Sequence, residues 1–141
     1  MVTSQLINAI IDQHRLRCST SIHSIDHWAR VLEIGRILAP RTGARQDVVE
    51  LFAVFHDSGR WNDGGDYEHG ERGAKIALAM RGKYFQLDDA GMDLLVLACR
   101  EHTLGKVDGD ITVLTCWDSD RLDLGRAGII PLARRLCTTA A

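Results

Sequence analysis

The sequence has little of what marks a β-sheet, a membrane protein or a strongly charged binding protein. It contains only two prolines, and no run in which apolar and polar residues alternate between turn signals, so strands are not expected. No apolar run is long enough to cross a membrane. A formal net charge of −2 does not indicate a broad electrostatic contact with nucleic acid or anionic lipid. We therefore expect a helical protein with neither a membrane nor a nucleic acid as its partner.

The cysteines exclude two kinds of site. Cys18, Cys99, Cys116 and Cys137 are far apart and none forms a CxxC pair, which excludes a zinc ribbon and a thioredoxin-like redox pair. Cys99 and Cys116 lie in apolar stretches and are predicted to be small core residues. The first residues, MVTSQLINAIIDQHR, mix polar and charged side chains into their apolar pattern, unlike a secretory signal. A reduced, cytoplasmic setting is expected.

The 141 residues, 45% apolar and 26% charged, are predicted to form one all-α domain, a bundle of about six to seven helices spanning residues 1–141. The predicted helices cover residues 4–17, 25–38, 46–58, 68–80, 88–102 and 111–124, and a short seventh begins near residues 130–131. Pro40 is expected to follow the second helix, Gly59 to cap the end of the third, and Asp110 to cap the start of the sixth.

Four of these helices carry a polar residue at the end of an apolar stripe. Residues three, four or seven apart share a helix face, and an apolar stripe faces the core. The polar residues in such positions are His27, His56, His102 and Asp120. Each must find a partner inside the protein or lose about a few kcal/mol of hydration.

Two interpretations of this pattern compete. A single buried imidazole is more often a core histidine bonded to a backbone carbonyl. Several inward imidazoles and carboxylates together are instead a ligand set for iron, manganese, cobalt, nickel or zinc. Adjacent helical residues point about 100° apart, so His56 and Asp57 reach one point only at a helix end, which Gly59 is expected to supply.

The ordered set resembles the HD-domain superfamily of metal-dependent phosphohydrolases. The resemblance rests on His27 in HWARV, the dyad His56-Asp57, His102 in REHT and Asp120 in DSDRLDL. It covers residues 23–126, and the segment HDSGRWNDGGDYEHGERGA is similar to small single-domain bacterial members.

The resemblance implies a centre of one or two divalent ions, among Mn, Fe, Co, Ni, Zn and Mg. His27, His56, Asp57 and Asp120 are the implied ligands of one ion. Asp57 is implied to bridge to a second ion, with His69 and His102 as its further ligands. His69 is alternatively an exposed residue at a helix start.

Other histidines and aspartates near this set are assigned differently. The segment HSIDH, which begins at His23, lacks the HExxH pattern of metalloproteases, and His23 is placed at the lip of the site. His14 is expected to face solvent. Asp118 lies about 200° from Asp120 around the helix, outside the site. Asp123 either supports the site or contacts substrate, or forms an ion pair in solvent.

The implied activity is hydrolysis of a small phosphorylated metabolite, a nucleotide as first choice, through metal-bound hydroxide. The predicted catalytic residues are Asp57, Arg60, Arg72 and Arg121. The three arginines would hold phosphate through their planar forks, although each is equally well a surface residue paired with an acid. Glu101 and Asp63 are candidates for the general acid. The loop 60–66 is either a lid or a simple connection.

Two other functions suit the same ligands: a di-iron oxygenase or nitrile-hydratase-like HD protein, and a non-enzymatic metal-binding module. No GYP triplet follows the dyad, which argues against cyclic-dinucleotide hydrolysis of the HD-GYP type. The length is too short for the synthetase domain of a bifunctional stringent-response enzyme, and no P-loop occurs. The expected partner is the phosphorylated substrate, and an oligomer remains an open alternative.

Overall fold

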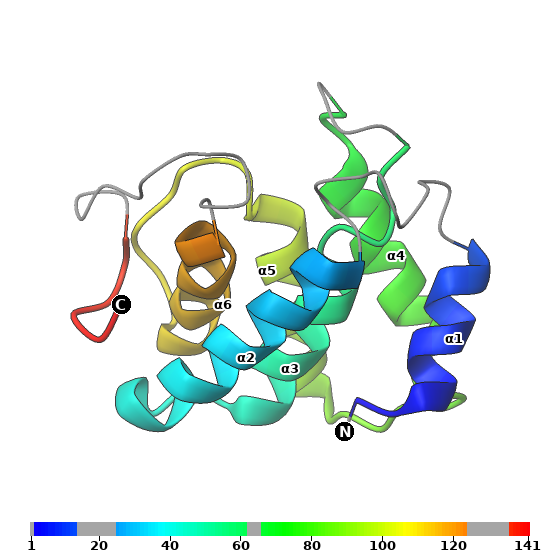
Figure 1. The fold of residues 1–141 in the computed structure, drawn as a ribbon, viewed down its shortest axis with the longest axis horizontal. Coiled ribbons are helices and arrows are strands. Elements are labelled where there is room, and N and C mark those ends of the chain that lie inside the picture. The colour runs from blue at the N-terminus through cyan, green and yellow to red at the C-terminus, as the bar shows by residue number, and fades with distance from the viewer. Residues whose placement is uncertain (1, 14–24, 62–65, 124–135) are drawn as a thin grey trace.

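The computed structural model describes residues 2–13, 25–61, 66–123 and 136–141, and within them it contains six α-helices and no β-strand. The helices, shown in Figure 1, are α1 (Ser4–Gln13), α2 (Ile25–Thr42), α3 (Gln46–Phe55), α4 (His69–Met80), α5 (Asp89–Glu101) and α6 (Ile111–Arg121). The prediction of an all-α bundle is confirmed. The predicted seventh helix near residues 130–131 lies outside the described residues. In the described part of the chain, no helix has the length and apolar character needed to cross a membrane.

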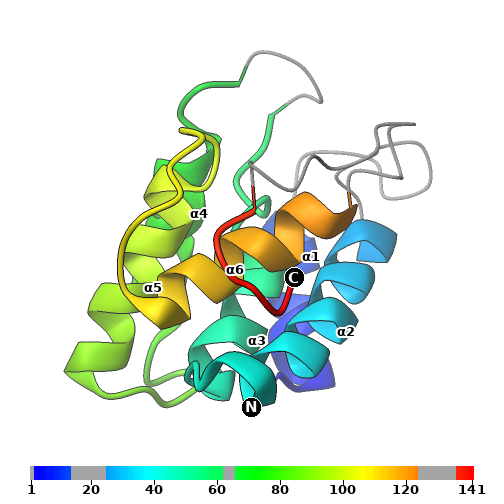
Figure 2. The same ribbon diagram turned by 90° about the vertical axis from the view of Figure 1, so that its left-hand side faces the viewer.

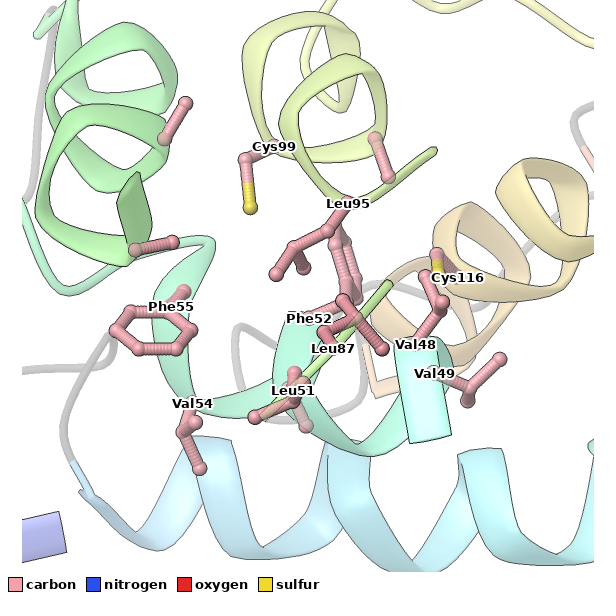
Figure 3. Close-up of a cluster of buried hydrophobic side chains, with 14 of the residues drawn as sticks. Val48, Val49, Leu51, Phe52, Val54, Phe55, Leu87, Leu95, Cys99 and Cys116 are labelled. Carbon is pink, nitrogen blue, oxygen red and sulfur yellow. The ribbon is translucent and has the colours of Figure 1, made fainter. Parts of the chain in front are cut away.

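Helix α3 is the centre of the bundle and contacts each of the other five described helices. All residues from 48 to 55 are buried, as expected for a helix that is apolar on every side. Figure 3 shows Phe52 and its neighbours on α3 facing Leu95 and Cys99 of α5 and Cys116 of α6. Cys99 and Cys116 are fully buried in this core, as predicted.

Five helix ends meet on one side of the bundle, the upper side in Figure 1. Helices α2 and α4 begin there, whereas α3, α5 and α6 end there. The C-terminal segment lies beside α6 (Figure 2), where Asp118 accepts hydrogen bonds from the backbone N–H groups of Cys137 at 2.6 Å and Thr138 at 2.8 Å. Side chains near the five helix ends can therefore reach a common point.

The structure confirms one predicted helix boundary and corrects two. Asp110 caps α6 by accepting a hydrogen bond from the Thr112 N–H at 2.8 Å. Helix α2 continues past Pro40 to Thr42, because the φ of proline suits a helix and its ring removes a single N–H donor. Gly59 does not adopt the positive φ of a capping glycine.

The true reason for Gly59 is the close approach of α4. A Cβ atom on Gly59 would lie 2.6 Å from the Cβ of Arg72. The same applies on α4 itself, where a Cβ on Gly73 would lie 2.4 Å from the Phe55 carbonyl oxygen and one on Gly70 2.4 Å from that of Cys99. These contacts leave no room for a side chain. The glycines therefore let the start of α4 pack directly on the last turns of α3 and α5.

This packing predicts that Gly73→Ala destabilises the protein. Helix propensity alone favours alanine by up to about 1 kcal/mol, but the new methyl group would overlap a backbone carbonyl that cannot rotate away. We expect the free energy of unfolding to fall by about 1–3 kcal/mol, measured by urea denaturation. Ala79→Ser, at an exposed position of the same helix, is the matched control. A Gly73→Ala protein more stable than the wild type would contradict the close approach.

Candidate metal centre

A first group of four potential ligands forms where α2, α3 and α6 meet. His27, His56, Asp57 and Asp120 each offer one ligand atom, and these atoms lie within 4.8 Å of one another. His27 Nε2 is 3.1 Å from His56 Nε2. It is also 3.3 Å from Asp57 Oδ2 and 3.1 Å from Asp120 Oδ1. His56 Nε2 is 3.3 Å from each of the same two carboxylate oxygens.

A second group shares Asp57 with the first. Asp57 Oδ1 is 3.3 Å from His69 Nε2 and 3.4 Å from His102 Nε2. The two imidazole Nε2 atoms are 3.0 Å apart. One oxygen of Asp57 thus faces each pair of histidines. The structure brings together all of the metal ligands predicted from the sequence, and His69 is buried rather than exposed.

The four imidazole rings are fixed by hydrogen bonds from their outer nitrogens. His56 Nδ1 donates to the Phe52 carbonyl at 3.0 Å, and His102 Nδ1 to the Cys99 carbonyl at 2.7 Å. His69 Nδ1 donates to a backbone carbonyl in the same way. Because these acceptors carry no hydrogen, each Nδ1 must be the protonated nitrogen. Every neutral ring therefore presents the lone pair of its Nε2 to the centre.

These facing lone pairs favour a proton or a metal cation between them. Two Nε2 atoms at 3.0 and 3.1 Å repel each other when both are unprotonated. Two ligands at about 2.1 Å from one ion and at right angles to each other lie about 3 Å apart. Both histidine pairs have this spacing, and a mixed imidazole and carboxylate set suits first-row divalent metals.

Asp123 supports the first group. Its Oδ2 accepts a hydrogen bond from His27 Nδ1 at 2.7 Å, and its Oδ1 accepts one from Arg30 Nε at 2.9 Å. Asp123 is buried, so its contact with His27 agrees with the first of the three interpretations given above, that it supports the site. A carboxylate behind a ligating histidine fixes its tautomer and makes Nε2 more basic.

The carboxylate of Asp120 depends on a positive charge beside it. Its Oδ1 is buried and faces the Nε2 atoms of His27 at 3.1 Å and His56 at 3.3 Å, so a proton on one of these rings or a bound cation compensates its charge. Burial acts to raise the pKa of Asp120, but His56 and His27 hold that pKa well below its usual range. The negative ends of α3, α5 and α6 also point to this region and favour a positive charge, and the positive ends of α2 and α4 partly offset this effect.

The histidines respond differently to these charges. Burial opposes protonation of His56, yet the charges of Asp57 and Asp120 outweigh it and raise the pKa of His56 to about 10. The pKa of His27 is also raised, because hydrogen bonding to the same two carboxylates outweighs burial. Burial lowers the pKa of His102. In the metal-free protein, a proton on the His27–His56 pair therefore takes the place of a metal ion.

Of the three predicted arginines, Arg60 alone has a described contact with the ligand set. Arg60 is buried and its Nε donates to Asp57 Oδ1 at 3.1 Å. Arg72 Nε donates to the Gly59 carbonyl at 2.7 Å, and its guanidinium pairs with Asp66. Arg121 donates to Cys137 Sγ at 3.2 Å. Its position about 100° around α6 from Asp120 explains why it contacts the C-terminal segment.

The structure describes two of the other candidate residues, Glu101 and Asp118. Glu101 forms an ion pair with Lys106. Asp118 binds the C-terminal backbone and is not part of the cluster, as predicted. His14, His23 and Asp63 lie outside the described residues.

Asp66 is a structural residue that the sequence patterns did not single out. Its carbonyl accepts the hydrogen bond of His69 Nδ1, and its carboxylate binds Arg72 and the backbone N–H of Trp61. Burial acts to raise the pKa of Asp66, but Arg72 and the Trp61 N–H lower it. The available signal was an aspartate three residues before a histidine at a helix start.

Comparison with known proteins agrees with this geometry. The family model described as the HD domain matches residues 24–136, a range that contains every residue of both groups. Neither a curated protein nor a solved structure matches the chain significantly.

The shared Asp57 predicts how the metal content responds to substitution. We expect about two divalent ions in the wild type and about one in His69→Ala, because the first group of ligands is complete without His69. Asp57→Ala should lose both ions, since both groups share that carboxylate. Elemental analysis of the purified proteins measures the content, with Asp93→Asn, at an exposed position of α5, as the control. Equal metal content in wild type and His69→Ala would contradict the second group.

The raised pKa of His56 predicts pH-dependent metal binding. A proton that is held up to pH about 10 must leave when an ion binds, so the affinity should rise with pH throughout the range below 10. With one proton displaced, the apparent dissociation constant should fall about tenfold per pH unit between pH 6 and 8. Calorimetry in buffers of different ionisation enthalpy measures the protons released. His69→Ala, which keeps the first group, should show the same slope, and a pH-independent affinity would contradict this assignment.

Proposed function

Since the chain belongs to the HD domain family and brings two His/Asp groups together, we propose that it is a metal-dependent phosphohydrolase. We further propose that its substrate is a small phosphorylated metabolite, with a nucleotide as the preferred class. The observation that carries the proposal is the carboxylate of Asp57, whose Oδ2 faces His27 and His56 and whose Oδ1 faces His69 and His102.

The residues around Asp57 suit hydrolysis by two ions. When bound, two divalent ions lower the pKa of a water molecule to about 7 and neutralise phosphoryl oxygens. The protein holds its ligands rigidly, because each histidine is fixed through Nδ1 and Asp57 is fixed by Arg60. Asp120, at 16%, has the most exposed side chain of the set. The centre is therefore shielded from bulk water, which strengthens its electrostatic interactions.

The second group also favours one alternative. Two histidines and one carboxylate with open positions are the ligands of non-haem iron oxygenases, and His69, His102 and Asp57 form such a set. An oxygenase would need redox-active iron and would consume oxygen. A phosphohydrolase would release phosphate without oxygen. The two activities are therefore separated by one pair of measurements.

The test is phosphate release by protein loaded with Mn, Fe, Co, Ni, Zn or Mg, measured with and without oxygen on nucleotides and other phosphate esters. We expect release with at least one metal. Asp57→Asn should reduce the rate by more than the roughly 10–100-fold loss typical of residues that only support a metal ligand. Asp93→Asn, at an exposed site on α5, should leave the rate unchanged.

Two outcomes would overturn the proposal. Oxygen consumption by the iron-loaded protein, with no phosphate release, would assign the oxygenase. A wild-type protein that binds both ions but neither releases phosphate nor consumes oxygen would be assigned as a metal-binding module.

A further inference from the structure

A pocket of about 300 Å³ lies beside the metal centre. It is bounded by Gln13 of α1, by the segment 58–61, and by Arg72, Lys75 and Ile76 of α4. Arg60 lines this pocket, and its Nε is 3.1 Å from Asp57 Oδ1. Arg60 therefore borders both the pocket and the metal centre.

The lining of the pocket is positively charged. Arg60, Arg72 and Lys75 line it, and no carboxylate is among its described lining residues. Asp57 and Asp66 compensate the two arginines from outside the pocket. Lys75 is exposed and has no ion pair with a described residue. The pocket therefore suits an anionic group, with Lys75 as the cation whose charge is not already compensated.

Trp61 adds an aromatic surface to the same pocket. Its side chain is 55% exposed, unusual for a residue so large and apolar. The Arg72 guanidinium lies 3.9 Å from the centre of its ring, and the Trp61 N–H donates to Asp66 Oδ2 at 2.7 Å. The indole is thus held in place while much of it faces solvent. An aromatic ring held in this way suits stacking with a planar ring of a ligand.

Helix α4 connects the pocket to the metal centre. His69, Arg72 and Lys75 follow one another at intervals of three residues, so each is next to the following one on the helix surface and the series turns from buried His69 to exposed Lys75. With a rise of 1.5 Å per residue, Lys75 lies about 9 Å along α4 from His69. One molecule the size of a nucleotide can therefore place a phosphate at the metal centre and other groups in the pocket.

We propose that this pocket binds the part of the substrate that does not react, with a planar ring stacked on Trp61 and a second anionic group bound by Lys75 and Arg60. The inference rests on the proposed function and narrows its substrate class. It specifies a ring-bearing phosphate compound with more than one anionic group, of the nucleoside diphosphate kind. A monophosphate of an acyclic metabolite leaves the pocket unused.

The test is calorimetric binding to the full-length, metal-loaded protein with three kinds of hydrolysis-resistant probe. Phosphonate analogues of a nucleoside monophosphate and a nucleoside diphosphate, each with a purine and a pyrimidine base, differ in the second anionic group. Methylenediphosphonate has two anionic groups and no ring. We expect the diphosphate analogue to bind more tightly than either of the others.

Two substitutions separate the two contacts. Lys75→Met should weaken the binding of the diphosphate analogue and of methylenediphosphonate by roughly fivefold, the effect of a largely exposed charge pair. It should leave the binding of the monophosphate analogue unchanged. Trp61→Leu should weaken the binding of both nucleotide analogues at least about fivefold and leave the binding of methylenediphosphonate unchanged. Lys83→Met and Tyr67→Leu, both at exposed positions outside the pocket, are the matched controls.

The outcomes distinguish this inference from the hydrolase proposal. The inference about the pocket would be overturned, even where phosphate release is found, by either of two results. One is equal binding of the three kinds of probe, and the other is Lys75→Met and Trp61→Leu proteins that bind the probes as their controls do. The expected binding pattern in a protein that releases no phosphate would support the pocket and overturn the hydrolase.

Discussion

The carboxylate of Asp57 is the contact on which the site depends. It follows α3 directly, is almost fully buried, and faces two histidines with each oxygen. With Asp120 it places two carboxylates in a region where an unpaired charge is costly. Four inward imidazoles surround them, and each neutral ring presents the lone pair of its Nε2 to the centre. The joined ends of five helices therefore enclose a site whose carboxylates and imidazoles favour positive charge.

Helix termini provide the means of orienting the ligands. The last carbonyl groups of an α-helix have no partner within the helix. His56 and His102 follow α3 and α5 directly, and their Nδ1 atoms donate to carbonyls of the preceding turn, those of Phe52 and Cys99. Each hydrogen bond thus uses a carbonyl of the last helical turn to fix a ring, and the Phe52 carbonyl also accepts the backbone N–H of His56. The ligands lie at helix ends because the groups that can orient them are there.

Helix-face periodicity predicted much of this site and could not predict the rest. The stripes that end at His27, His56, His102 and Asp120 gave the direction of each side chain, and the all-α bundle follows from the same pattern. Periodicity carries no information on how closely two helices approach. The sequence therefore offered a cap as the reason for Gly59, whereas the structure shows a contact with Arg72.

Loop residues were beyond that reasoning for a related physical cause. Asp66 lies before α4, where no helical period applies, yet it orients His69, Arg72 and Trp61. Arg121 was chosen for its place beside Asp120 in the sequence, but neighbours on a helix point about 100° apart. Its described contacts are with Cys137 and Trp117. Adjacency along the chain brings His56 and Asp57 together at a helix end, whereas within α6 it does not set the direction in which Arg121 points.

The two ligand groups differ in negative charge, and this difference sets how strongly each would stabilise a metal ion. The first combines two histidines with the carboxylates of Asp57 and Asp120, whereas the second has two histidines and only the shared Asp57. Arg60 also donates to Asp57 Oδ1, the oxygen that faces the second group, and reduces the negative potential there. An ion in the first group therefore gains more electrostatic stabilisation than one in the second. In the proposed hydrolase, the second position, which shares Asp57 Oδ1 with Arg60, is the one at which an anionic group of the substrate would supply the missing negative charge.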